Sequence, residues 1–355
     1  MRKPRLFAAL AASLAAAISF GAHAAPKEQF NVCWTIYAGW MPWEYGATQG
    51  IVNKWAKKYD IDINVVQLND YVESINQYTA GGFDGCTMTN MDALTIPAAG
   101  GVDSTALIVG DFSNGNDGIV LKGENKTLAD LKGTPVNLVE LSVSHYLLAR
   151  GLERAGLSEK DLKVINTSDA DLVAAFASDD VKAVTTWNPL LAEVAATPGV
   201  SKVFDSSQIP GEIIDLMVVN SETLKDNPAF GKALTGAWYE IMATMAADTA
   251  AGKATREHMA KASGTDLAGF EAQLAATKMF FSAQDAVAFA TSGRLPETMR
   301  KVADFSFAHG LLGEGAQSSG AIGMSFAGGV TTGNADNLKL RFDPSYMQMA
   351  ADGKL

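Results

Sequence analysis

Residues 136–191 read VNLVELSVSHYLLARGLERAGLSEKDLKVINTSDADLVAAFASDDVKAVTTWNPLL. A short apolar strand leads into Ser142, a natural helix N-cap, and the helix that follows is expected to end at Gly156. A second capped helix is expected near Ser168, followed by a strand that stops at residues 187–189. Both strand ends and one helix start therefore face the same side, where open α/β sheets bind ligands. The stretch predicts a ligand-binding domain and contains no recognisable catalytic centre.

The same alternation of strands and helices extends on both sides of this stretch and predicts an α/β fold with mostly parallel sheets. We expect two lobes, the first built from residues 25–112 and 215–355 and the second from residues 113–214. Two crossings, near residues 109–118 and 211–219, would form a hinge that closes around a ligand. Residues 38–46 are expected to be a loop, and residues 222–310 to be helical with Ser282 and Ser292 as caps. The tail from Gly313 is expected to be irregular.

The first 24 residues have the pattern of a secretory signal peptide. Arg2, Lys3 and Arg5 precede an apolar run over residues 6–20, and Ala22-His23-Ala24 is an A-x-A cleavage site. We therefore expect cleavage after Ala24 and a monomeric protein of the periplasm. No later apolar run is long enough to span a membrane, so direct membrane insertion is not expected.

Net charge limits the kinds of partner that the protein can bind, and the cysteines and histidines limit its disulfides and metal sites. The net charge of −11 becomes more negative after the signal peptide is removed, which argues against nucleic acid and anionic lipid. Cys33 and Cys86 lie in predicted strands, and either a disulfide or two buried thiols fits them. After His23 is lost, the remaining histidines are scattered, so neither a metal nor a cofactor is predicted. The run DFSNGND lacks the spacing of a calcium loop.

Several runs resemble one family of exported proteins. SVSHYLLARGLERAGLSEKDLKVI and DADLVAAFASDDVKAVTTWNPLL are similar to the binding proteins of ABC importers for nitrate, taurine, alkylsulfonates and thiamine precursors. TLADLKGTPV and FDGCTMTNMDALTIPAAGGVDSTALIVGD extend the likeness to about residues 30–220. WTIYAGWMPWEYG and GDFSNGND resemble the branch named as urea importers, some of which are thought to handle guanidine. The resemblance implies a type II periplasmic binding fold and delivery of the ligand to a membrane permease.

Aromatic and acidic side chains recur at the predicted cleft. Aromatic faces and carboxylates together favour a small planar cation, through cation–π contacts and charge-assisted hydrogen bonds. Each acid also has a structural alternative: a helix cap for Asp92, a turn for Asp111, solvent or a basic partner for Glu140, and a hinge hydrogen bond for Asp215. The resemblance places family ligand contacts in the first helical turn after Ser142. The expected ligand-binding residues are Tyr37, Trp40, Trp43, Asn90, Asp92, Asp111, Glu140, Ser142, Ser144, His145, Trp187, Asn188 and Asp215.

The leading hypothesis is a solute receptor for urea or guanidinium. The alternative is a receptor for nitrate, taurine, an alkylsulfonate or a thiamine-pyrimidine precursor, although Glu140 is a poor neighbour for an anion. An enzyme is not expected, because the chain has no GxSxG, HExxH or P-loop and no cysteine cluster. A ligand-gated sensor would have the same sequence features as an import receptor.

Overall fold

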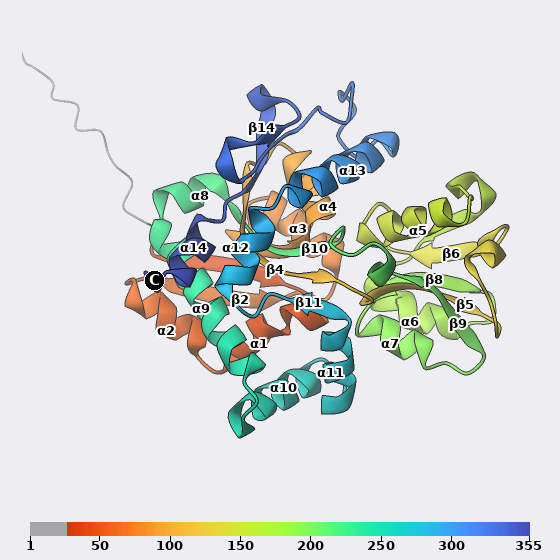
Figure 1. Ribbon diagram of the computed structural model, residues 1–355, viewed down its shortest axis with the longest axis horizontal. Helices are drawn as coiled ribbons and strands as arrows, with labels where there is room; N and C mark the ends of the chain where they lie inside the picture. The colour runs from red at the N-terminus through yellow and green to blue at the C-terminus, as the bar shows by residue number, and fades with distance from the viewer. Residues whose placement is uncertain (1–26) are drawn as a thin grey trace, which may run out of the picture.

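The computed structural model describes residues 27–355 and shows two lobes, each built on its own β-sheet (Figure 1). The predicted signal peptide, residues 1–24, lies outside the described residues. Within the described part of the chain, no helix has both the length and the apolar character needed to cross a membrane. The predicted α/β fold with two sheets and a largely helical C-terminal region is confirmed.

The larger lobe contains a mixed sheet whose described strands number nine. Its central strands are buried along almost their whole length, because helices cover both sides of the sheet. Along the sheet the order is β13 (Thr331–Thr332), β12 (Gly323–Ser325), β14 (Leu338–Phe342), β4 (Ser104–Ser113), β10 (Ile214–Asn220), β3 (Gly85–Thr89), β1 (Gln29–Trp34) and β2 (Asp62–Gln67), and β11 (Thr277–Met279) pairs with β4.

The smaller lobe contains five strands, drawn in yellow and green in Figure 1. Their order is β7 (Lys163–Asn166), β6 (Pro135–Leu138), β8 (Ala183–Trp187), β5 (Asp117–Lys122) and β9 (Val200–Asp205). Strands β7, β6 and β8 are parallel, so their carboxyl ends meet at one edge as the sequence predicted. The helices of this lobe are α5 (Val143–Arg154), α6 (Asp169–Ala177) and α7 (Leu190–Ala195).

Most of the helices belong to the larger lobe (Figure 1). The region expected to be helical after Ser221 is broken where Asn227 and Pro228 begin a new helix. The larger-lobe helices are α1 (Met41–Thr48), α2 (Ile51–Lys58), α3 (Tyr71–Thr79), α4 (Asn90–Ala93), α8 (Ser221–Asp226), α9 (Pro228–Ala246), α10 (Ala250–Ala262), α11 (Leu267–Ala275), α12 (Ala283–Ala290), α13 (Arg294–Ala308) and α14 (Ser345–Ala351).

Three local predictions are wrong. The expected loop at residues 38–46 is helical, because Pro42 occupies the first turn of α1, where its missing N–H costs nothing. Ser292 does not cap α13, whose N-cap is Gly293. The tail is not wholly irregular: β14 alternates its side chains, burying Leu340 and Phe342, and pairs with β4.

The chain passes between the lobes along two neighbouring segments. The first joins β4 to β5, and the second joins β9 to β10. Ser206 ties them together, because its Oγ lies 2.6 Å from Ser113 Oγ and accepts the Gly115 N–H at 2.7 Å. The proposed lobe boundaries, after residue 112 and before residue 215, stay a prediction.

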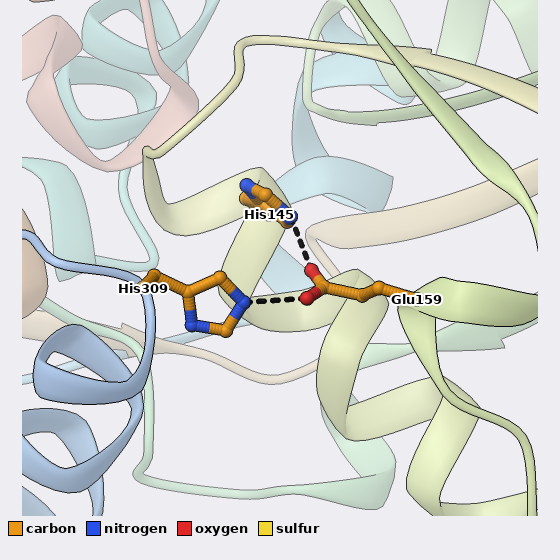
Figure 2. Close-up of side chains that lie close together, drawn as sticks. All are labelled: His145, Glu159 and His309. Carbon is orange, nitrogen blue, oxygen red and sulfur yellow. Dashed lines mark hydrogen bonds and ion pairs between the residues drawn. The ribbon is translucent and has the colours of Figure 1, made fainter.

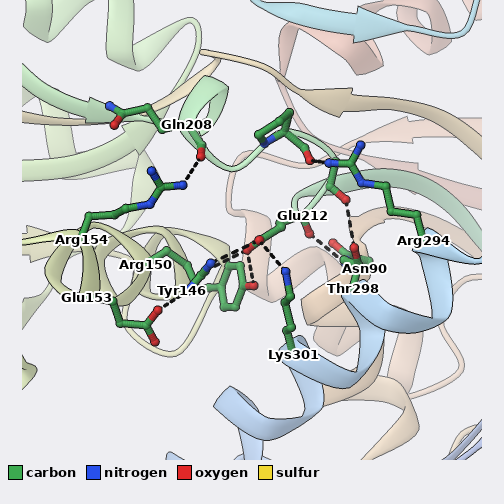
Figure 3. A network of polar contacts seen from close by, with 12 residues as sticks. Asn90, Tyr146, Arg150, Glu153, Arg154, Gln208, Glu212, Arg294, Thr298 and Lys301 are labelled. Carbon is green, nitrogen blue, oxygen red and sulfur yellow. Dashed lines mark hydrogen bonds and ion pairs between the residues drawn. The ribbon is translucent and has the colours of Figure 1, made fainter.

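Glu212 in the second crossing connects helices of both lobes (Figure 3). Tyr146 and Arg150 on α5 donate to Glu212 Oε2 at 2.8 and 2.9 Å, and Lys301 on α13 donates to Oε1 at 3.2 Å. Burial alone would raise the pKa of Glu212, but these hydrogen bonds and charges outweigh it and lower the pKa. The network therefore packs α5 of the smaller lobe beside α13 of the larger lobe.

A disulfide joins Cys33 on β1 to Cys86 on β3. The two strands are parallel neighbours, and the two cysteines are direct partners in their register. The sequence had left a disulfide and two buried thiols as alternatives, and the structure contains the disulfide.

A candidate binding cavity between the lobes

A small cavity lies where the two lobes meet. Its volume is about 10 Å³, which is about the space of one water molecule and far below the roughly 300–1,000 Å³ of pockets that take drug-sized ligands, so its walls must move apart before a larger ligand can enter. The smaller lobe contributes the ends of β5, α5 and β8, and the larger lobe contributes the rest. No lysine, arginine or histidine is among the described lining residues, which are Tyr37, Trp40, Tyr71, Thr89, Asp117, Val143, Trp187, Ile213 and Asp215.

Four aromatic rings form much of the wall. Trp40, at the end of a short 3-10 turn after β1, packs 5.0 Å from Tyr37 and 5.8 Å from Tyr71. Trp187, at the end of β8 in the smaller lobe, meets Tyr71 edge-on at 5.5 Å. Trp40 Nε1 is buried without a hydrogen-bond partner. The rings therefore enclose a narrow space and leave one indole N–H available to a ligand.

Two carboxyl groups stand side by side in the larger lobe, and of the two only Asp215 is among the described cavity-lining residues. Asp111 on β4 and Asp215 on β10 are paired residues in adjacent antiparallel strands. Tyr37 donates to Asp111 Oδ1 at 3.2 Å, while Oδ2 of both aspartates is buried without a partner. Burial raises the pKa of both groups, and for Asp215 the neighbouring charge of Asp111 raises it further. A cation between them would let both ionise.

Asp117 faces the cavity from the smaller lobe. Burial raises its pKa to about 7, the nearby charges of Asp215 and Asp92 act in the same direction, and a hydrogen bond with Ser113 opposes them. Since Asp215 belongs to the larger lobe, carboxyl groups from both lobes reach the same space. Closing the lobes would therefore complete an acidic site.

Asp92 holds Tyr71 in place rather than capping a helix. Its Oδ2 accepts from Tyr71 OH at 2.6 Å and from Thr89 Oγ1 at 2.8 Å, and Thr89 is the N-cap of α4. Burial raises the pKa of Asp92 to about 6, against the lowering effect of these hydrogen bonds. Asp92 thus orients Tyr71, which lines the cavity, without lining the cavity itself.

Four of the residues expected to bind the ligand lie elsewhere. Trp43 points into the larger lobe, where its ring packs 5.2 Å from Trp238. Asn90 donates to the Glu212 carbonyl at 3.1 Å and accepts the Ile214 N–H at 3.0 Å, so it supports the second crossing. Glu140 is exposed to solvent. None of these lines the cavity, nor does His145, which faces Glu159, so their roles in ligand binding stay predictions.

The remaining polar residues of the expected site surround helix starts. Ser142 caps α5 by accepting the Ser144 N–H at 3.2 Å. Asn188 Oδ1 accepts the Ala192 N–H at 2.9 Å at the start of α7. Ser144 Oγ is buried without a hydrogen-bond partner. None of the three is among the cavity-lining residues, although Val143 of the same turn is. Their roles in ligand binding stay predictions.

Tyr71 and Asp117 line the cavity but were not singled out in the sequence. Tyr71 is the first residue of α3, directly after the Asp70 cap, so it also follows the end of a strand. Asp117 ends the run DFSNGND, which suggests a turn at Asp111 and lacks the spacing of a calcium loop. Both positions follow the rule that ligands bind at strand ends, and that rule would have found them.

The chain belongs to the family described as NMT1/THI5 like, whose model matches residues 51–251. Among its curated relatives, a binding protein of Brucella abortus is 29% identical over 139 residues, which are 38% of this chain and 43% of that protein. An aliphatic sulfonates-binding protein of Escherichia coli is 36% identical over 94 residues, 26% of this chain and 30% of that protein. The match thus spans less than half the length of either relative.

The fold is that of the periplasmic solute-binding proteins. The alkanesulfonate-binding protein SsuA from Xanthomonas axonopodis pv. citri, solved with MOPS, superposes with a TM-score of 0.67. Its sequence identity is 18%, and the match covers 82% of this chain and 96% of that chain. The predicted two-lobe fold is confirmed by this likeness.

Proposed function

We propose that the protein is a periplasmic receptor that delivers a small nitrogen-rich cation, of the guanidinium type, to the permease of an ABC importer. Family, fold and the position of the cavity between two hinged lobes support a binding role rather than catalysis. The observation that carries the ligand class is the lining itself: aromatic faces with Asp117 and Asp215, and no basic residue among the described lining residues. Such a site attracts cations and repels anions.

Two other ligands have a specific observation in their favour. Urea is neutral and has a carbonyl oxygen, which could accept from the unpartnered Trp40 Nε1. A sulfonate is the ligand that the names of two similar proteins print, and Val143 brings the N-terminus of α5, with its positive dipole end, to the cavity. A sulfonate would, however, be buried against two aspartates.

Titration calorimetry with guanidinium chloride, urea, taurine, nitrate, an alkylsulfonate and an aminopyrimidine separates these candidates. We expect guanidinium to bind with a Kd of about 40–100 µM, because the ceiling of about 1.5 kcal/mol per non-hydrogen atom limits so small a ligand to about 6 kcal/mol. Matched sodium chloride serves as the ionic-strength control. Micromolar binding of a sulfonate or nitrate, with no heat from guanidinium or urea, would refute the proposed ligand class.

Guanidinium affinity should fall as the solution is acidified. Asp117 has a pKa of about 7 in the empty cavity, and the pKa of Asp215 is raised well above its usual value, so below pH 7 a cation must displace protons from both and the affinity should drop at least about tenfold per pH unit. Because the pKa of Asp117 is raised, the folded empty protein holds more protons than the unfolded chain between about pH 4 and pH 7. Stability from this group therefore declines across that window as pH rises, and bound cation restores it.

Calorimetry in buffers of different ionisation enthalpy measures the proton release directly. Urea provides the control, since a neutral ligand gains nothing from an ionised Asp117. A guanidinium affinity that is constant from pH 8 to pH 5 would contradict this expectation.

A further inference from the structure

Two histidines and a glutamate from both lobes converge outside the binding cavity (Figure 2). His145 lies on α5, and Glu159 begins the short 3-10 turn Glu159–Asp161, both in the smaller lobe. His309 ends α13 of the larger lobe. The cluster borders an open groove between α5 and α13, lined in part by Ser158, Glu159 and His309, so an ion has a path from solvent.

The three side chains present their ligating atoms to one another. These atoms all lie within 4.8 Å, and His309 Nε2 is 2.5 Å from Glu159 Oε2. His145 Nε2 forms an ion pair with Glu159 Oε1, and both atoms are buried without any other partner. Two nitrogen ligands and one carboxylate are thus gathered in one place, and His145 Nε2 and Glu159 Oε1 have no partner other than each other.

His309 is already oriented as a metal ligand. Its Nδ1 lies 2.9 Å from the carbonyl oxygen of Phe305, to which an Nδ1–H would donate. Its Nε2 faces Glu159 Oε2 at 2.5 Å, where an Nε2–H donates to the carboxylate, and a bound metal would take the place of that proton. Histidines that bind metals commonly make this second hydrogen bond to a backbone carbonyl.

His145 needs one local adjustment to bind an ion. Its Nδ1 accepts the Leu141 N–H at 3.1 Å, which places the ring proton on Nε2. Leu141 is the third residue of a turn closed by Ser142 N–H and the Val139 carbonyl, and its φ of 64° is unfavourable for a residue other than glycine. Rotating the peptide between Glu140 and Leu141 would relieve that φ and replace the N–H at Nδ1 with a carbonyl. The turn therefore has an accessible alternative that suits a metal-bound His145.

We propose that His145, Glu159 and His309 form a binding site for a divalent transition metal of the zinc class, which ties α13 of the larger lobe to the smaller lobe. Two imidazoles and one carboxylate are a ligand set that zinc uses when a fourth position stays open to water. The sequence predicted no metal because these histidines are far apart along the chain, and the fold brings two of them together. None of the three residues is among the lining residues of the proposed cation cavity.

The test is zinc binding by tag-free protein, first stripped with a chelator and then measured by competition with a chromogenic chelator. We expect one zinc ion per chain with a Kd of micromolar or below. His309→Ala, which removes a partly exposed side chain, and Glu159→Gln should each weaken binding at least tenfold. His258→Ala is the matched control, because His258 pairs with Glu44 on the larger lobe and takes no part in the cluster.

Cobalt substitution gives a second readout that does not depend on affinity. Co²⁺ in a four-coordinate site should produce strong visible absorption, which His309→Ala should abolish and His258→Ala should retain. Circular dichroism establishes that each variant is folded. The proposal is overturned if folded wild-type protein binds no zinc, or if His309→Ala binds it as tightly as wild type. It is also overturned if His258→Ala causes the same loss.

Discussion

Asp215→Asn should weaken guanidinium binding by about 100-fold or more, which moves the Kd from micromolar to millimolar. Asparagine has the shape of aspartate but lacks the charge, so a bound cation would lose a buried charge-assisted hydrogen bond. Loss of one partner from a buried ion pair costs about 3–5 kcal/mol. A loss of about 2.7 kcal/mol already raises the Kd 100-fold. Asp215 Oδ2 is the atom concerned, since it is buried beside the cavity without a partner in the empty site.

The substitution should also stabilise the empty protein slightly, because it removes a carboxyl group that is costly to bury next to Asp111. Titration calorimetry gives the affinity, and thermal unfolding without ligand gives the stability. Asp62→Asn is the matched control, as it removes an exposed carboxylate from the edge strand β2 of the same lobe. An unchanged guanidinium affinity in Asp215→Asn would refute the proposal that the cation binds in this cavity.

The fold could be predicted because alternating strands and helices have few solutions. Local signals also hold: Ser142 caps α5 and Asp70 caps α3 in the structure. The C-terminal tail could not be predicted as well. Strand β14 is held by burial of Leu340 and Phe342 beside β4, a pairing that depends on residues more than 200 positions away.

The site was predictable where a side chain ends a strand. Trp40, Trp187 and Asp215 all line the cavity, as the strand-end rule indicates. Trp43 does not line the cavity, because Pro42 lies in the first turn of α1 and the helix directs Trp43 toward Trp238. Sequence spacing alone does not show on which face of an unrecognised helix a side chain lies.

The metal cluster and Asp111 illustrate a second limit. Asp111 was predicted at the cleft, but its pairing with Asp215 follows from the register of β4 and β10, which the sequence does not specify. His145 was assigned to the ligand because of its place on α5, whereas the opposite lobe supplies His309 to meet it through Glu159. Contacts between lobes depend on how the two sheets are docked, and no local pattern encodes that.

Removing the Cys33–Cys86 disulfide should lower the free energy of unfolding by about 4 kcal/mol. The bond spans 53 residues, and closing a loop of that length restricts the unfolded chain by about this amount. The folded state should change little, because both cysteines are buried in adjacent strands that their backbone hydrogen bonds hold together. Urea unfolding with and without reductant measures the difference, and the reduced chain should also show a larger m-value, since its unfolded state is less compact.

Cys33→Ala combined with Cys86→Ala is the control, because its urea midpoint should not respond to reductant. Its stability should lie near that of the reduced wild type, lowered slightly further by the two lost sulfur atoms in the core. Thiol titration of the denatured, unreduced wild type should detect no free thiol among the two cysteines of the chain. Two free thiols, or an unfolding midpoint that reductant leaves unmoved, would mean that β1 and β3 are held by packing and hydrogen bonds alone.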